Sequence, residues 1–280
     1  KGFELSISSV NIEKEDFVWS TSLSLSQNKS ELISLGDGQD YITLDDVVAA
    51  GNGSPIRLTP GYPIPGFWGA NNLGTYKTRT EIDADGRFGT SFLGGPRLED
   101  QNGDGTWNPL DYVYQGSPEP DLFGGIRNVF SYKKWTLDTF AHFSIGNTMF
   151  NGSVAESYYA RGAYLNLLPE LKDRWTEENY MSDIPRAGTA FGTYVTTNET
   201  SFQDGSFFRL KNVTLTYDLD NPPFVRDASI YLSAQNLLLI SDYKWGDPEV
   251  SQYGNQLNRG VSDSTYPYST SVSLGLNIKF

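Results

Sequence analysis

The sequence predicts an all-β fold: an antiparallel transmembrane β-barrel, of which these residues form about seven strands. Three observations favour this fold. Several segments of about ten residues alternate between apolar and polar side chains, as membrane-spanning strands do. Short and long connections between these segments alternate along the chain. Aromatic residues make up 14% of a chain whose mean hydropathy is only -0.42, which is typical of apolar bands joined to polar loops.

The last segment has the clearest strand pattern. In residues 270 to 280, alternate positions carry Val272, Leu274, Leu276 and Ile278, and the positions between them carry Ser, Gly, Asn and Lys. One face of this strand is therefore expected to meet lipid and the other water. Three other segments repeat the pattern: residues 17 to 26, 135 to 146 and 230 to 238.

Three weaker segments complete the set: residues 3 to 12, 122 to 132 and 207 to 218. In these segments the alternation slips by one position or leaves Arg127, Arg209 and Lys211 on a mixed face. About seven strands cannot close a barrel, because the smallest barrels have about eight strands. We therefore expect residues 1–280 to form the C-terminal part of a barrel domain whose other strands precede Lys1.

The connections between the predicted strands differ in length. Residues 13 to 16, 133 to 134 and 219 to 227 are short, whereas residues 31 to 121, 147 to 202 and 241 to 267 are long or intermediate. Outer-membrane barrels have short periplasmic turns and longer extracellular loops, so the layout predicts that the long connections face outward. A soluble β-sandwich is the alternative, because it also produces alternating strands and Gly-rich turns.

The chain end favours the membrane barrel. Gly275, Ile278 and Phe280 occupy positions that resemble the signal by which barrel-insertion machinery recognises outer-membrane proteins. The alternative is an ordinary edge strand that stops at Phe280. A soluble domain seldom ends on an exposed aromatic edge without a charged residue or a tail to protect it.

Composition excludes several classes of function. Lys+Arg 21 against Asp+Glu 34 gives a net charge of -13, which does not suit binding to nucleic acid. Without cysteine, thiol catalysis and zinc-ribbon sites are excluded, and the single His142 has no partner for a His-based metal cluster. We expect no enzyme activity. A run of 18 or more apolar residues, the sign of a transmembrane helix, is absent from the sequence.

One acidic segment has the spacing of a calcium loop. Asp100, Asn102 and Asp104 occupy positions one, three and five, Thr106 offers a backbone carbonyl at position seven, and Asp111 stands at position twelve. The pattern departs from an EF-hand, which has Glu at position twelve and a helix on each side. The alternative is a loop of Asx-turns that holds no ion.

Aromatic residues of the first and last long connections are candidates for substrate binding. Trp68, Trp107 and Tyr112 belong to the first, and Tyr243 and Trp245 to the last. Aromatic faces can stack on sugars or on peptide side chains. Long loops also need an apolar core of their own, and barrels carry aromatic girdles, so packing is the alternative role.

Several motifs resemble the SusC family of TonB-linked outer-membrane transporters of Bacteroidota. Those motifs are residues 63 to 69, 100 to 105, 116 to 120, 174 to 179, 184 to 186, 204 to 215, 234 to 237 and 247 to 249. The resemblance implies a 22-strand barrel in the cell outer membrane, surrounded by its lipid. It also implies a SusD-like lipoprotein lid, and a plug and a TonB-binding segment that lie outside these residues.

The expected function is therefore TonB-dependent import of bulky nutrients, either oligosaccharides or peptides. Two other readings stay open. A SusC-like barrel could serve as a structural subunit of an outer-membrane assembly, or the chain could be a secreted calcium-binding β-domain that binds glycans.

Overall fold

The computed structural model describes most of the chain. The described residues are 1–36, 38–44, 54–85, 92–154, 167–187, 200–220, 224–249, 256–262 and 265–280. Within these ranges, no helix is long and apolar enough to cross a membrane.

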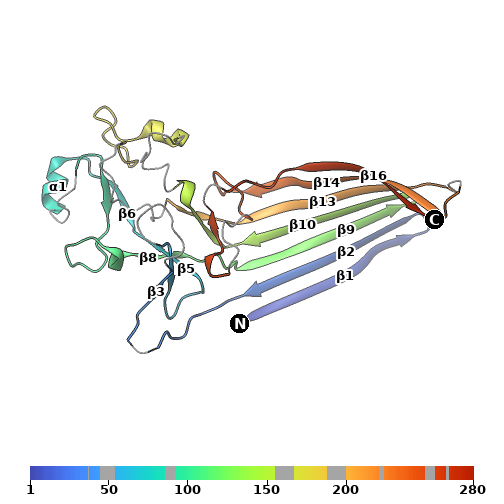
Figure 1. The fold of residues 1–280 in the computed structure, drawn as a ribbon, viewed down its shortest axis with the longest axis horizontal. Helices are drawn as coiled ribbons and strands as arrows, with labels where there is room; N and C mark the ends of the chain where they lie inside the picture. The colour runs from blue at the N-terminus through green and yellow to red at the C-terminus, as the bar shows by residue number, and fades with distance from the viewer. Residues whose placement is uncertain are drawn as a thin grey trace.

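Seven long strands form one antiparallel sheet in the order β1-β2-β9-β10-β13-β14-β16. Their bounds are β1 Gly2–Lys14, β2 Phe17–Asn28, β9 Leu122–Tyr132, β10 Trp135–Ile145, β13 Phe207–Asp218, β14 Asp227–Ser241 and β16 Ser271–Lys279. Each predicted strand segment corresponds to one of them. The sheet is open between β1 and β16 (Figure 1), because a fragment of a barrel cannot close.

The two ends of the sheet differ (Figure 1). The connections between β1 and β2, β9 and β10, and β13 and β14 lie at one end, together with the C-terminus; we call it the turn end. The long connections lie at the other end, which we call the loop end. At the turn end, Lys133 opens the connection from β9 to β10 with φ 53, the left-handed conformation that two-residue hairpin turns require.

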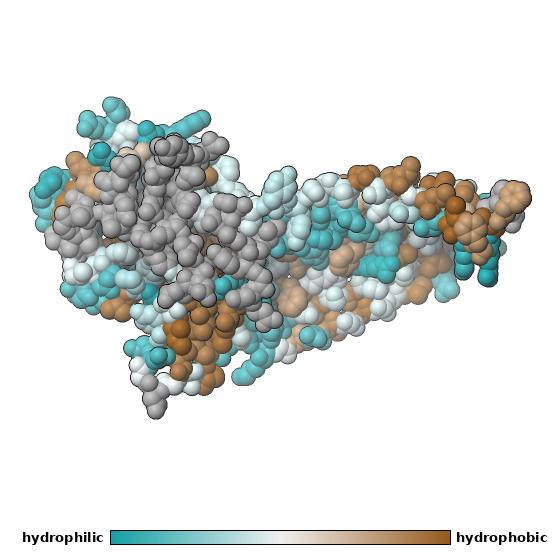
Figure 2. Space-filling view, in the orientation of Figure 1, coloured by the Kyte–Doolittle hydropathy of each residue, from teal (hydrophilic) through white to brown (hydrophobic). Residues whose placement is uncertain are grey.

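Most of the large apolar side chains of the sheet share one face, here called the outward face. Leu274 lies opposite Leu232, and Leu276 lies opposite Ile230. Leu274 is 77% exposed and Leu276 56%, so these side chains have no protein to pack against and suit a lipid surface. In the space-filling view, hydrophobic residues gather at the end of the sheet where the chain terminates (Figure 2).

Aromatic rings line the outward face near the turn end. The rings of Trp135 and Tyr217 lie 4.6 Å apart, and those of Trp19 and Phe130 stack at 5.6 Å. Outer-membrane barrels carry aromatic girdles of this kind where lipid tails meet headgroups.

Polar side chains occupy the opposite, inner face. Arg127 on β9 makes a bidentate ion pair with Asp138 on β10, with Nε–Oδ1 3.0 Å and Nη2–Oδ2 2.5 Å. The hydroxyl groups of Ser8 and Ser22 lie 3.2 Å apart across β1 and β2. The mixed faces of the sequence have a structural cause, because register shifts lie between Val10 and Ile12 on β1 and between Leu210 and Asn212 on β13. A β-bulge of this kind moves the alternation by one position.

A polar row interrupts the outward face. Asn128 lies opposite Thr21 on one side and Thr139 on the other. The Asn128 side-chain oxygen accepts hydrogen bonds from the Thr21 hydroxyl at 2.7 Å and from Trp19 Nε1 at 3.1 Å. The Thr21 oxygen in turn accepts one from Asn11 at 2.6 Å. The side-chain oxygens of Thr21 and Asn128 are thus paired with neighbours and are not left to face lipid unpaired.

The long connections fold into small sheets at the loop end (Figure 1). One has the order β3-β4-β5-β8, with bounds Ile42–Thr43, Ile56–Leu58, Gly66–Gly69 and Val113–Gly116. A second has the order β12-β11-β15, with bounds Phe202–Asp204, Thr148–Asn151 and Val261–Ser262. The third pairs β6 Asn72–Thr75 with β7 Pro96–Leu98, and the helical turns are α1 Arg79–Asp85, η1 Pro109–Asp111, η2 Pro169–Asp173 and η4 Gln256–Asn258.

One small core joins all three long connections. Ile56 and Phe67 come from the first, Phe150 from the second and Val261 from the third, and none is more than 1% exposed. The parallel pairing of Phe150 with Val261 ties the second connection to the third. The loop end is therefore a packed body with its own apolar centre.

Candidate functional site

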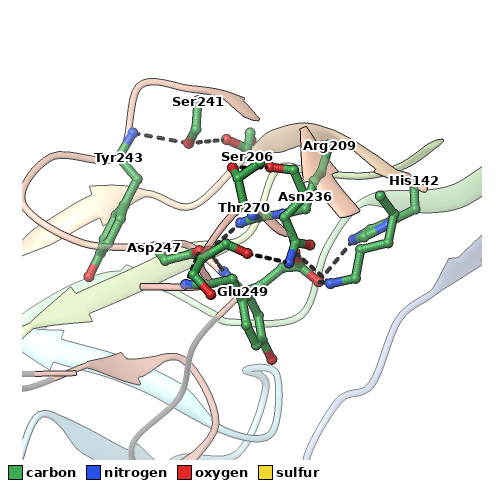
Figure 3. A network of polar contacts seen from close by, with 12 residues as sticks. His142, Ser206, Arg209, Asn236, Ser241, Tyr243, Asp247, Glu249 and Thr270 are labelled. Atoms are coloured by element: carbon green, nitrogen blue, oxygen red, sulfur yellow. Dashed lines mark hydrogen bonds and ion pairs between the residues drawn. The ribbon is translucent and has the colours of Figure 1, made fainter. Parts of the chain in front are cut away.

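A cluster of charged side chains joins the inner face of the sheet to the last long connection (Figure 3). We call it the ion cluster; its members are His142, Arg209, Lys211, Asp247 and Glu249. The first three come from neighbouring strands of the sheet, and the two acids come from the connection between β14 and β16.

Arg209 is the centre of the ion cluster. It lies on β13 directly opposite His142 on β10, and its side chain is 2% exposed. Its Nη2 donates to Asp247 Oδ1 at 2.5 Å, and its Nε makes an ion pair with Glu249 without the alignment of a hydrogen bond. Two carboxylates thus face one buried guanidinium, as a charge removed from water requires.

Glu249 contacts nitrogen atoms of three side chains of the ion cluster. Its Oε1 lies 2.9 Å from His142 Nε2 and 3.4 Å from Lys211 Nζ. Burial tends to raise the pKa of Glu249, but the hydrogen bond from His142 and the charges of Arg209 and Lys211 outweigh burial and lower that pKa. The carboxylate is therefore held ionised.

Asp247 connects the two arms of the last connection. Its Oδ1 also accepts the backbone N–H of Glu249 at 3.1 Å, and its Oδ2 accepts that of Tyr268 at 3.1 Å. The Tyr268 ring lies beneath two cations, 4.5 Å from Lys211 Nζ and 5.6 Å from the Arg209 guanidinium carbon. Both the outgoing and the returning arm are thus fixed to β13.

A second set of hydrogen bonds fixes the same connection where it leaves β14 and enters β16 (Figure 3). The Ser241 hydroxyl donates to the Ser206 carbonyl at 2.7 Å, and the Thr270 hydroxyl donates to the Asn236 carbonyl at 2.8 Å. Together with the ion cluster, these bonds hold the connection over the inner side of the sheet. The arrangement serves to position a loop.

Four charged residues of this site stood out in the sequence, but the alternation of apolar and polar residues alone did not explain them. Arg209 and Lys211 stood on a mixed face of a predicted strand, and Asp247 and Glu249 stood in a motif of the resembled family. A buried cation on a strand requires an anion, and the motif that contains Asp247 and Glu249 supplies two. The pairing itself depends on the bulge beside Lys211, which the sequence does not reveal.

The acidic segment predicted to bind calcium forms a series of Asx-turns. Asp100 accepts the N–H of Gly103 at 2.8 Å and of Gly105 at 3.0 Å, and Asp104 accepts that of Thr106 at 2.7 Å. Asn102 accepts the N–H of Asp104 at 2.9 Å. Among the described residues, no group of three or more Asp, Glu or His side chains gathers as a metal would need. Calcium binding there stays a prediction.

Asp111, the last predicted calcium ligand, is fully buried. Its Oδ1 accepts the N–H of Gln101 at 3.0 Å and its Oδ2 accepts that of Asn108 at 2.8 Å. Its carboxylate therefore closes the loop by joining the two ends of the segment.

Four of the five aromatic residues predicted to bind substrate lie within packed parts of the loop end. Tyr112 is 5% exposed, and the Arg57 guanidinium lies 4.6 Å from its ring centre. Trp107 and Trp68 are partly buried against the core that contains Tyr112. Tyr243 is 7% exposed, and burial raises its pKa to about 12.

Trp245 differs from the other four because 49% of it is exposed. Its backbone has φ 64, an uncommon conformation for a large residue. Of the five predicted residues, Trp245 presents the most accessible ring.

Gly275 and Ile278 of the predicted insertion signal lie on opposite faces of β16, and Phe280 follows the strand. Ile278 is outward and 46% exposed, and Phe280 is 92% exposed. Gly275 is on the inner face opposite Tyr231, and a Cβ there would lie 2.2 Å from that ring. Gly275 therefore leaves room for the Tyr231 ring to cover the strand.

Comparison with known proteins finds relatives that are named as TonB-dependent receptors. The chain is 38% identical over 290 residues to TonB-dependent receptor P26 of Formosa agariphila, covering 100% of the chain and 29% of that receptor. It is 26% identical over 299 residues to TonB-dependent receptor SusC of Bacteroides thetaiotaomicron, covering 100% of the chain and 26% of that receptor. No family model matches the chain.

The fold has a solved counterpart. The structure of the RagAB peptide transporter matches 100% of the chain and 29% of its own chain, with a TM-score of 0.78 and 24% identity. These matched proteins are named as receptors and transporters, not as enzymes.

The sheet and its relatives define an antiparallel transmembrane β-barrel segment of the bacterial outer membrane. Along its whole length the chain is similar to part of several TonB-dependent receptors, SusC among them. The chain spans about 29% of the length of TonB-dependent receptor P26.

Proposed function

We propose that the protein containing this chain imports bulky nutrients, oligosaccharides or peptides, by TonB-dependent transport through a 22-strand barrel. A SusD-like lipoprotein covers its outer mouth. The plug and the TonB-binding segment are formed by residues outside this chain. The barrel-insertion machinery recognises Gly275, Ile278 and Phe280. Receptor-class relatives along the whole chain support the proposal.

The observation that carries this proposal is the construction of the loop end. Three long connections share one core, and the ion cluster fixes the last of them to the inner face of the sheet. Ordering so much chain costs conformational entropy. A preformed outer vestibule for substrate and lid gives that ordering a function.

The second long connection offers the sharpest test. Its residues 167 to 187 contact the first connection close to the paired strands β6 and β7: Lys77 pairs with Asp183 at 2.9 Å, and Arg186 N–H donates to the Gly94 carbonyl at 2.9 Å. A short linker in place of these residues removes the segment and leaves every long strand intact.

We expect the shortened receptor to insert into the outer membrane but to lose co-purification with its lid and growth on the imported nutrient. The double substitution Lys77→Ala and Asp183→Ala is the matched control, because it removes one partly exposed ion pair and should retain both activities. A shortened receptor that keeps both its lid and its growth would instead favour a structural subunit.

A further inference from the structure

Residues 175 to 184 of the second long connection form a closed loop, here called the knob. The Trp175 N–H donates to the Ile184 carbonyl at 2.8 Å and joins the two ends of the knob. Between these ends, the Asn179 N–H donates to the Thr176 hydroxyl at 3.0 Å and makes a tight turn. The yellow part of the chain in Figure 1, which contains the knob, lies at the loop end and away from the seven-stranded sheet.

Hydrogen bonds and packing fix the conformation of the knob. The Ser182 hydroxyl donates to the Asp173 carbonyl at 2.6 Å, and the Ser182 carbonyl accepts the Thr75 hydroxyl of the first connection at 2.6 Å. Trp175 is 7% exposed and lies against Gly94, where a Cβ would come within 2.5 Å of the indole ring. The knob is therefore held both by its own side chains and by the first connection, and its shape is set before any partner arrives.

The tip of the knob carries two large side chains in water. Tyr180 is 51% exposed and Met181 is 60% exposed. The groups that fix the knob are backbone amides and small polar side chains, so they hold these two residues outward and do not bury them. Because the tip is already ordered, a partner that covers it loses little conformational entropy from this side of the contact.

The shape and the chemistry of the tip suit a protein partner. Residues 177 to 181 are all exposed, so the tip is a projection, whereas sites for small molecules are concave. Tyrosine and methionine are enriched in protein interfaces. Glu177 and Glu178 make no ion pair among the residues that the structure describes. Their carboxylates beside Tyr180 and Met181 complement a recess that is apolar inside and basic around its edge.

We propose that the knob docks into an apolar recess of a second protein, which takes the side chains of Tyr180 and Met181. Lys or Arg side chains around that recess pair with Glu177 and Glu178. This inference rests on the proposed function, under which the second protein is the lipoprotein lid. The knob is then the part of the second long connection that the lid recognises.

The two methionines of the chain allow a test without any substitution. Met181 is at the tip of the knob, whereas Met149 is 3% exposed, and methionine exposed to water is the more readily oxidised. The full-length receptor is treated with peroxide alone and in complex with its lid, and mass spectrometry of its peptides gives the oxidation of each methionine. We expect Met181 to oxidise several-fold more slowly in the complex, and Met149 to oxidise slowly in both samples.

Equal oxidation of Met181 in the two samples would overturn the proposal. Slow oxidation of Met181 in the receptor alone would overturn it too, because other parts of the receptor would then cover the knob.

Substitutions at the tip measure its share of the binding free energy. The double substitution Tyr180→Ser and Met181→Ser changes exposed side chains, so the fold should be retained. Binding of the purified lid to this variant, measured by calorimetry, should weaken by about 30-fold, as loss of a hot-spot side chain predicts. Leu110→Ser is the matched control, because Leu110 is 58% exposed on the first connection. It should leave lid binding unchanged.

The charges of the tip are tested with salt. Added salt should weaken lid binding to the unchanged receptor, because it screens the pairs with Glu177 and Glu178. The double substitution Glu177→Gln and Glu178→Gln should bind the lid more weakly at low salt and depend less on salt. A salt dependence equal to that of the unchanged receptor would contradict the basic edge of the recess.

The outcomes separate this inference from the proposed function. An unchanged receptor that carries no lid would overturn both. If the unchanged receptor binds its lid and the double variant at Tyr180 and Met181 binds it as tightly, only this inference fails. Equal weakening by Leu110→Ser would overturn it as well, because the lid would then recognise apolar surface anywhere on the loop end.

Discussion

The sheet and the loop end use large apolar residues in opposite ways. In the sheet, Leu274 is 77% exposed on the outward face, while polar pairs such as Arg127 and Asp138 occupy the inner face. In the loop end, Phe67 and Phe150 are fully buried. The solvent explains the difference: lipid surrounds the sheet and water surrounds the loops. An exposed apolar residue is therefore unfavourable in the loop end, where it meets water, and favourable in the sheet, where it meets lipid.

The largest expected effect follows from breaking the ion cluster, which joins the two regions. Arg209→Met leaves Asp247 and Glu249 buried without their guanidinium, and loss of one partner from a buried ion pair costs about 3 to 5 kcal/mol. Chemical unfolding of the full receptor should show this loss, together with faster proteolysis between β14 and β16. Arg226→Met is the control, because Arg226 is 74% exposed and its contact with Asp227 spans 4.0 Å.

A charge on the outward face should have the next largest effect. Leu276→Arg should destabilise the barrel by about 2 to 4 kcal/mol if this position lies near the middle of the bilayer. Asn277→Arg places the same charge one residue further on, on the inner face, and should change stability far less. Unfolding from lipid vesicles measures both, and equal values for the two variants would contradict the assignment of faces.

A smaller effect should follow from opening the acidic loop. Asp111→Ala removes the acceptor of several backbone N–H groups and should cost about 1 to 3 kcal/mol, whereas Asp104→Ala at an exposed turn should cost less than about 1 kcal/mol. Metal analysis of the purified receptor at millimolar calcium addresses the ion itself. If calcium is absent under those conditions, the loop is an Asx-turn structure and the predicted metal site is wrong.

Lowering the pH should have the smallest effect on the stability of the ion cluster. Glu249 has a pKa below its ordinary value of 4.5 in the folded protein, so it adds stability above that value and loses it as the pH falls through the lowered pKa. We expect the protection of amide hydrogens near Tyr268 against exchange, relative to their intrinsic rate at each pH, to fall in this acidic range. Glu249→Gln should exchange faster at neutral pH and depend less on acid.

The sequence predicted the strands better than the site. All seven segments corresponded to observed strands because a period of two residues is a local property that lipid on one face enforces. The bulges beside Lys211 and Asn11 did not show in the pattern except as slips. The pairing within the ion cluster could not be predicted, because His142 lies on β10 and Glu249 lies in the connection after β14, so the two meet only once β13 and β14 are in place.

Burial also separated residues that the sequence treated as equal. Tyr112, Tyr243 and Trp245 were all candidates for substrate contact, yet only Trp245 remains half exposed. Composition shows that aromatic residues are present in a loop, but not which of them its core uses.

The polar row has a consequence for the order in which the sheet can form. Hairpins β1–β2, β9–β10 and β13–β14 close over few residues, so each can form as soon as it is made. The bond between Thr21 and Asn128 spans 107 positions, and its loop-closure entropy must be overcome before it contributes anything. Until the second hairpin docks on the first, Thr21 and Asn128 lack each other as partners, and an unpaired polar group in lipid is costly. The polar row therefore disfavours insertion of the sheet into the bilayer one hairpin at a time. It favours assembly in which the hairpins pair with each other before their outward face enters lipid.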